Sequence, residues 1–403
     1  MALMLRNRGA ILLLMLNIFL IFMGIGLVVP IMPTYMDVLH ISGSVVGLLV
    51  AAFSFTQLIF SPLAGRLSDT WGRKKIIVIG MLIFSISELI FGLSNTPFFL
   101  FASRMLGGIG AALIMPAVMA YTADVTTGEE RGKGMGFINA AITTGFIIGP
   151  GIGGFIAEYG IRVPFYAAAV AGAVAAIVTI IVLPDSKPQL GKQQQEIVKL
   201  PKQNLFSQLA NSYRQPYFLA LIIVFVASFG LANYETVFGL FVDKKFGFTA
   251  KDIAVIITFG SIAGAVVQVT VFGWILKKFG EKNVVSFCLL MAALFIVLTL
   301  FVHQYWMILL VTFIVFLAID ILRPTISTQM SKMAMEQQGY VAGLNSAFTS
   351  MGNILGPIIA GALFDVNLNF PYVSAGIVLF LCFLLSLRAR KDERIPGHRE
   401  LEV

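Results

Sequence analysis

Nine stretches of this sequence run for 20 residues or more without Asp, Glu, Lys or Arg. They cover residues 9–36, 38–65, 134–157, 163–184, 215–234, 253–276, 283–319, 337–364 and 366–387. A helix that crosses the hydrocarbon core of a bilayer needs about 20 mainly apolar residues. Each stretch is therefore long enough to span a membrane.

The composition indicates a chain that lies mostly within the bilayer. Of 403 residues, 58% are apolar and 12% are charged, whereas soluble domains are about 25% charged. Division at Gly, Pro and charge clusters predicts twelve spans, near residues 10–36, 44–65, 75–94, 98–120, 134–157, 163–183, 216–241, 252–276, 284–302, 305–331, 339–364 and 370–388. The first stretch follows Arg6 and Arg8 as in a signal peptide, but it is too long and lacks a cleavage site, so we expect a retained span.

The basic residues explain the net charge of +8 without nucleic acid. If both termini face the cytoplasm, the loops and termini on that side hold 22 of the 28 Lys and Arg. This bias is typical of membrane proteins, whose basic cytoplasmic loops face anionic lipid. We therefore expect cytoplasmic termini and no nucleic-acid partner. Cys288 and Cys382 lie in apolar stretches, far from any metal-ligand spacing.

The chain divides into two halves that repeat with an offset of about 208 residues. We predict six-helix halves at 1–183 and 216–388, a central loop at 184–215 and a tail at 389–403. Pro116 matches Pro324, and Glu158 matches Asp365. Residues 145–150 likewise match residues 352–357. Parallel repeats of this kind suggest a central binding region between the halves, as in many transporters.

Four motifs resemble those of the major facilitator superfamily, and specifically of its twelve-span drug:proton antiporters. They are a first-span pattern, a loop signature, a fourth-span pattern and a glycine-rich fifth-span pattern typical of antiporters. Their residues are Leu20, Gly24, Pro30 and Pro33; Gly65, Asp69, Gly72, Arg73 and Lys74; Arg104, Gly108, Gly110 and Ala111; and Gly145, Gly149, Pro150, Gly153 and Gly154. Residues 228–236, 320–324 and 343–353 look closer still to the quinolone and multidrug efflux pumps of Gram-positive bacteria.

The resemblance implies an all-α membrane protein with twelve transmembrane helices in two pseudo-symmetric six-helix bundles. It implies antiport of lipophilic or cationic drugs, including quinolones and dyes, against protons by alternating access. It also implies a monomer in the bacterial cell membrane, with neither cofactor nor metal. Close helix packing is predicted at the fifth span, because its glycines leave one face without side chains. They are Gly145, Gly149, Gly153 and Gly154.

Five ionisable residues fall within predicted spans: Glu88, Arg104, Glu235, Asp320 and Arg323. A charge in a span costs about 2.5–3.5 kcal/mol on insertion scales, so each is a functional candidate. A carboxylic acid held away from water binds its proton more tightly and can exchange it near neutral pH. Glu235 and Asp320 are therefore the predicted proton-coupling pair. The alternative for Asp320 is a permanent salt bridge with Arg323, three residues along the same helix.

Arg104 could polarise a proton acceptor or line the binding pocket, or simply bond the carbonyl groups at the end of a helix. We expect Glu88, in the peripheral third span, to be a carboxyl group at the lipid interface. The predicted substrate-binding residues match pocket positions of the resembled pumps or lie on one face of the tenth span. They are Phe22, Gln57, Arg104, Met115, Phe146, Glu235, Phe316, Asp320, Arg323, Asn345 and Phe348. Aromatic rings bind cations, and Met adapts to varied shapes, although any single Phe could equally pack against lipid or core.

The predicted gating motifs combine Gly65, Asp69, Gly72 and Arg73 with the glycines of the fifth span and Pro150. In the resembled family the loop around Asp69 holds the two halves together, although its charges could also only enforce sidedness. The second half has Lys277 at the Asp69 position. Any gate that depends on this Asp should therefore be asymmetric.

Three other functions compete with export. An uptake symporter for a metabolite shares the fold, but the fifth-span motif and the scarcity of polar pocket residues disfavour it. An intramembrane enzyme is disfavoured because the sequence lacks HExxH, GxSxG and any His-carboxylate cluster. A lipid-binding or receptor protein is compatible with the composition.

Overall fold

The computed structural model describes residues 2–185, 213, 217–333 and 338–392, and within them every regular element is a helix. The first half contains α1 (Ala2–Leu39), α2 (Gly43–Trp71), α3 (Arg73–Leu93), α4 (Pro97–Val125), α5 (Gly128–Ile156), the 3₁₀ turn η1 (Ala157–Tyr159) and α6 (Val163–Val182). The second half contains α9 (Phe218–Phe246), α10 (Ala250–Thr270), α11 (Phe272–Phe279), α12 (Glu281–Leu298), η3 (Thr299–Phe301), α13 (Tyr305–Met333), α14 (Gln338–Val366) and α15 (Phe370–Asp392).

Twelve of these helices are long and apolar enough to cross a membrane, as the sequence predicts. Several predicted span ends differ from the helices by several residues, for example at the end of α2 and at the start of α5, and two further differences change how the chain is divided. The eighth span does not continue to residue 276, because the helix breaks at Val271 and resumes as α11. Thr270 and Val271 are β-branched and favour helix weakly. The last helix continues to Asp392, past the predicted start of the tail. Most of the central loop lies outside the described residues.

The two halves repeat the same packing pattern. In the first half α1 packs on α5 and α6, and α4 packs on α2 and α3. In the second half α9 packs on α14 and α15, and α13 packs on α10 and α12. Glycines permit the closest approaches: a Cβ on Gly149 would lie 2.6 Å from the carbonyl oxygen of Met23, and one on Gly356 would lie 2.7 Å from that of Phe229. The close packing expected from the fifth-span glycines is therefore observed.

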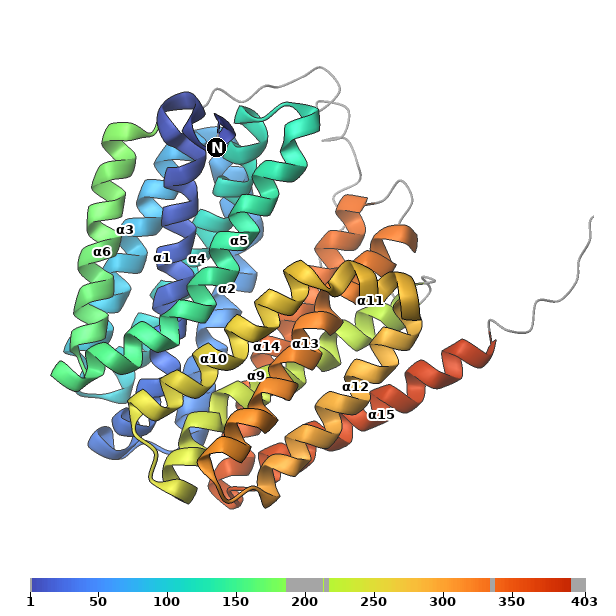
Figure 1. Ribbon diagram of the computed structural model, residues 1–403. Coiled ribbons are helices and arrows are strands. Elements are labelled where there is room, and N and C mark those ends of the chain that lie inside the picture. The colour runs from blue at the N-terminus through green and yellow to red at the C-terminus, as the bar shows by residue number, and fades with distance from the viewer. Residues whose placement is uncertain (1, 186–212, 214–216, 334–337, 393–403) are drawn as a thin grey trace, which may run out of the picture.

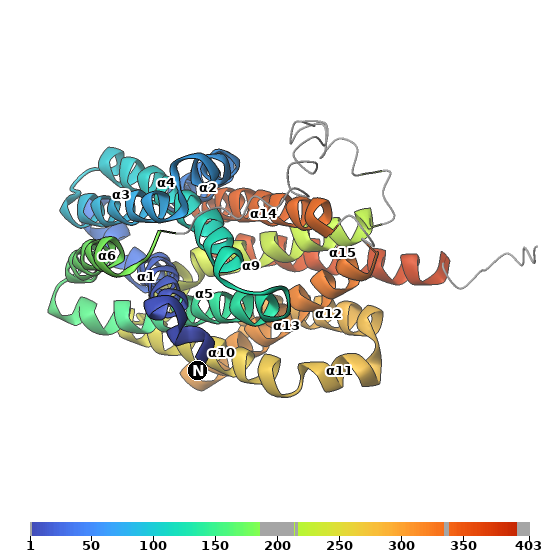
Figure 2. The same cartoon turned by 90° about the horizontal axis from the view of Figure 1, so that it is seen from above.

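The halves meet mainly through two helix pairs, α2 with α14 and α5 with α10, which lie side by side in Figure 2, and α1 also contacts α9 and α10. We call the side where α1 begins the N-terminal face and the opposite side the far face. Figure 1 shows the bundles close together at the far face and spread apart toward the N-terminal face. The contacts agree, since the start of α2 meets the end of α14 and the end of α5 meets the start of α10.

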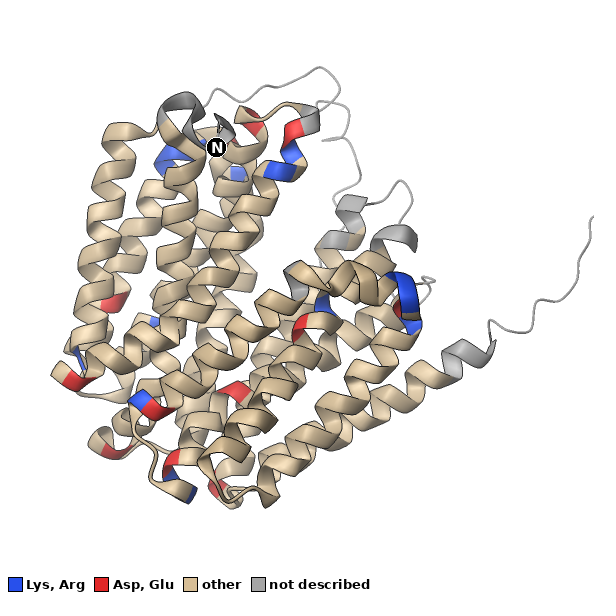
Figure 3. Ribbon diagram, in the orientation of Figure 1, with Lys and Arg blue, Asp and Glu red and all other residues tan. Residues whose placement is uncertain are grey.

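Charged residues gather at the helix ends, and only a few interrupt the apolar middle of the bundles (Figure 3). This distribution fits a bilayer, in which charge is costly away from the surfaces. The charges that remain in the middle are the candidates for a functional site.

Candidate functional site

Glu235 and Asp320 lie within helices of the second half, on α9 and α13 respectively, and both are partly buried. Glu235 interacts electrostatically with Asp320 and with Arg323. The structure thus brings the two predicted coupling carboxylates and one arginine into a single charged group, which we call the carboxylate cluster.

The Asp320 carboxylate lies directly against the backbone of α10. A Cβ added to Gly264 would lie 2.1 Å from Asp320 Oδ2, and one added to Gly260 would lie 3.2 Å from the Phe316 ring. Only glycine at 264 leaves space for the carboxylate in this position. Sequence reasoning missed Gly264, although a GxxxG spacing in a predicted span signals a close helix contact.

Arg323 is exposed even though it lies within α13. None of the ion pairs among the described side chains joins it to Asp320. The permanent Asp320–Arg323 salt bridge is therefore not formed in this structure, which leaves the Asp320 carboxylate without a locked counter-ion. An exposed guanidinium within a span must face water rather than lipid, given the cost of placing it in hydrocarbon.

Arg104 lies apart from the carboxylate cluster, buried between α3 and α4 of the first half. Its Nη2 donates to Glu88 Oε1 at 3.1 Å, and its guanidinium lies 4.4 Å from the centre of the Phe91 ring. Glu88 is 0% exposed, so its expected place at the lipid interface is wrong. Glu88 Oε2 and Arg104 Nε have no partner. Buried polar atoms of this kind are commonly satisfied by internal water.

The predicted aromatic residues fall into two groups, one in each half. Phe22 and Phe146 pack edge to face with ring centres 4.8 Å apart, and Phe146 is 44% exposed. Phe316 and Phe348 belong to the second half's apolar core, where they are 5% and 7% exposed. Gln57, Met115 and Asn345 are partly exposed. No aromatic pair among the described rings crosses between these two groups.

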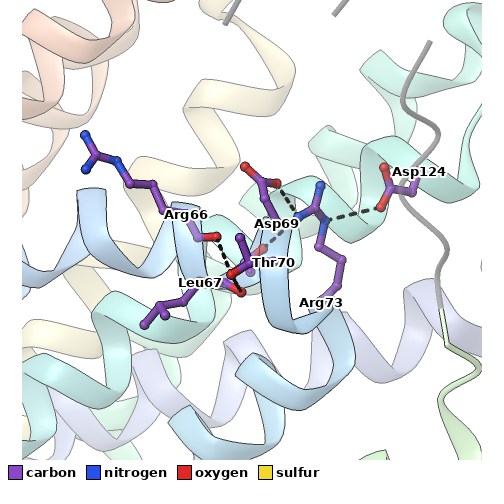
Figure 4. Close-up of polar contacts among 7 residues, drawn as sticks. Arg66, Leu67, Asp69, Thr70, Arg73 and Asp124 are labelled. Atoms are coloured by element: carbon purple, nitrogen blue, oxygen red, sulfur yellow. Dashed lines mark hydrogen bonds and ion pairs between the residues drawn. The ribbon is translucent and has the colours of Figure 1, made fainter. Parts of the chain in front are cut away.

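The loop signature forms a polar network confined to the first half (Figure 4). Arg73 pairs with Asp69, donates through Nη1 to Ser68 Oγ at 3.2 Å and donates through Nε to Asp124 Oδ2 at 3.3 Å. Gly72 separates α2 from α3 with φ +96°, a conformation that other residues rarely adopt. Asp124, at the end of α4, is a member that sequence reasoning missed.

Two repeat-related polar contacts join the halves at the far face, and we call them the far-face seal. The Asp365 carboxylate accepts hydrogen bonds from the backbone N–H groups of Gly43 at 2.7 Å and Ser44 at 2.8 Å. Lys251 Nζ lies 3.0 Å from Glu158 Oε1. The repeat already aligned Glu158 with Asp365, so the sequence contained a signal for this pair.

The described residues contain no group of three or more His, Cys, Asp or Glu side chains placed to hold a metal ion. The two cysteines are buried and unbonded. The ionisable groups that remain for chemistry are therefore carboxylates and arginines within helices.

Comparisons with known proteins match the whole length of the described fold. The profile of the family described as Major Facilitator Superfamily matches residues 14–268 and 220–402. The chain is 50% identical over 365 residues to Multidrug resistance protein 2 of Bacillus subtilis (strain 168), which covers 91% of each chain. It is 42% identical over 366 residues to the Quinolone resistance protein NorA of Staphylococcus aureus (strain COL), covering 90% of this chain and 92% of that one.

Solved structures share the fold at low sequence identity. A bacterial homolog to the human lysosomal transporter Spinster superposes with a TM-score of 0.77 at 15% identity, covering 96% of this chain and 98% of that one. The nucleoside transporter NupG superposes with a TM-score of 0.73 at 17% identity, covering 96% and 100%.

Proposed function

This chain belongs to the major facilitator superfamily of transporters and is not an enzyme, and we propose that it exports lipophilic and cationic drugs in exchange for protons. The observation that carries the proposal is the carboxylate cluster, in which two acidic side chains within spans have no locked counter-ion. Relatives named for multidrug and quinolone resistance support drugs as the substrate class.

The proposed coupling uses competition at Glu235 and Asp320. When these carboxylates are ionised they attract a cationic drug, and when they are protonated they release it. Exposed aromatic side chains such as Phe146 would supply apolar and cation–π contacts to planar molecules. The exposed Arg323 would tune Asp320 electrostatically.

We assign the N-terminal face to the cytoplasm of a bacterial cell, because the basic residues are concentrated in the loops on that side. With this assignment both termini are cytoplasmic, and the structure is open toward the inside with its far-face seal closed. We propose a monomer as the working unit, because one chain already supplies both six-helix halves and the region between them.

Reconstituted proteoliposomes test the proposal. Ethidium transport into the vesicles should drive protons out of them, because an antiporter moves the two in opposite directions. A protonophore should abolish drug accumulation. Uptake of a metabolite with protons, the alternative mechanism of the same fold, would move drug and proton in the same direction. Efflux that persists with a protonophore would contradict the coupling.

A further inference from the structure

A groove of about 720 Å³ lies between α11, α12 and α13 in the second half. Its wall is almost entirely apolar and includes Trp274, Phe279, Phe287, Met291, Ile314 and Leu317. Phe287 is 62% exposed and Trp274 is 55% exposed, so the groove opens on the outside of the protein. Its volume is in the range of pockets that bind small molecules.

The break before α11 distinguishes this region from the first half. There α2 continues as one helix to Trp71, and Arg73 ties the following loop to Asp124 of α4. In the second half the helix breaks at Val271, and Lys277 replaces the acidic Asp69. The short helix α11 therefore covers the groove from the side of the N-terminal face.

Two lysines occupy the last turn of α11, the helix that covers one end of the groove. Lys278 Nζ lies 4.7 Å from the centre of the Trp274 ring and 5.4 Å from that of Phe279, and both rings line the groove. Lys277 is exposed on the same last turn of α11. A tryptophan with neighbouring lysines is typical of the level at which lipid headgroups lie.

We propose that this groove binds an anionic phospholipid, with an acyl chain along the apolar wall and the phosphate on Lys277 and Lys278. The apolar wall suits a hydrocarbon chain, and the lysines select for negative charge at its end. A lipophilic cation, the substrate class proposed above, would instead be repelled by the two lysines. The site is separate from the carboxylate cluster, so its occupant is a bound lipid rather than a transported drug.

Trp274 provides a direct probe, because the chain has only two other tryptophans, Trp71 and Trp306. In a Trp71→Phe/Trp306→Phe variant we would measure quenching of Trp274 fluorescence by lipids with brominated acyl chains. Phosphatidylglycerol should reach half-maximal quenching at a roughly tenfold lower fraction than phosphatidylcholine with the same chains, because the two lysines attract its net negative charge, whereas phosphatidylcholine is zwitterionic.

Matched variants separate the groove from general surface charge. Lys277→Gln/Lys278→Gln should abolish the preference for phosphatidylglycerol, whereas Lys74→Gln/Lys75→Gln, which removes the same charge from the first turn of α3, should retain it. Cys288→Phe should reduce quenching by filling the groove without changing its charge, and Met291→Phe provides a second filling variant if the first does not fold. Each of three outcomes would overturn the proposal. They are equal quenching by both lipids, loss of the preference in the Lys74/Lys75 control, and unchanged quenching in the variants with a filled groove.

Discussion

Asp365 at the end of α14 caps the first turn of α2 at Ser44, although the two residues belong to opposite halves. Asp365 Oδ2 accepts hydrogen bonds from the Ser44 N–H at 2.8 Å and from Ser44 Oγ at 2.5 Å. A carboxylate at a helix N-terminus is stabilised by the unpaired N–H groups and by the helix dipole. The contact therefore stabilises the conformation in which the far face is closed.

Asp365→Asn should shift the protein toward a far-face-open state. The substitution removes the negative charge, and hydrogen bonds to charged groups contribute about 1.5–3 kcal/mol. Loss of roughly half of this free energy should raise the population of the open state about tenfold. Electron paramagnetic resonance would measure this population from the distance between spin labels at Tyr159 and Phe370, which lie at the far-face ends of opposite halves. Asp252→Asn is the control, because the Asp252 carboxylate accepts a hydrogen bond from the Thr249 N–H at the start of its own helix, and it should leave the distances unchanged.

Gly264→Ala should abolish proton-coupled transport while the protein still folds. The added Cβ would lie 2.1 Å from Asp320 Oδ2, so the carboxylate must leave its position. Gly136→Ala is the matched control, because a Cβ there meets no atom within 4 Å. Ethidium transport in proteoliposomes and the melting temperature should be measured together. Equal activity of both variants would show that the position of Asp320 is unimportant.

Glu235→Gln and Asp320→Asn should each impair drug export and flatten its pH dependence. In the native protein protons compete with cationic drug, so drug affinity should fall as the pH falls; without a titrating carboxyl it should vary little. Binding titrations of ethidium at several pH values would measure this. A double variant with the native pH dependence would refute the assignment of the pair.

Arg104→Gln should destabilise the protein more than the double change Arg104→Gln/Glu88→Gln. Removal of one partner of a buried ion pair costs about 3–5 kcal/mol, because the other charge remains unpaired. Neutralising both partners should recover much of this cost. Thermal unfolding in detergent would give the two effects, and a double variant no more stable than the single one would argue against the pairing.

Asp69→Asn should slow the alternation between conformations with little loss of drug affinity in the present conformation. Its partner Arg73 is also bonded to Asp124, so the loop should keep its fold. Lys277→Ala should affect transport only mildly, because no matching network exists among the described side chains of α11. Equal transport defects in both variants would contradict an asymmetric gate.

The fold could be predicted from the sequence because span length and loop charge depend on local composition. The partners of buried charges could not be predicted in the same way. Glu88 appeared peripheral, yet the rotation of α3 against α4 places it on Arg104. Gly264 was overlooked because its importance arises from Asp320 on another helix. Such pairings depend on how helices are rotated, and hydrophobic stretches specify that rotation weakly.

The far-face seal also determines what its opening costs. A Cβ on Gly47 would lie 2.1 Å from the carbonyl oxygen of Pro357, and one on Gly361 would lie 2.2 Å from that of Gly43. At these points backbone meets backbone, but apolar side chains of both halves, among them Val46, Leu49 and Phe364, also belong to one buried core. Separation therefore exposes apolar surface, at roughly 25 cal/mol per Å², in addition to breaking the polar contacts. The polar part of the resistance responds to salt: external salt, which screens exposed ion pairs such as Lys251 with Glu158, should speed the opening of this side.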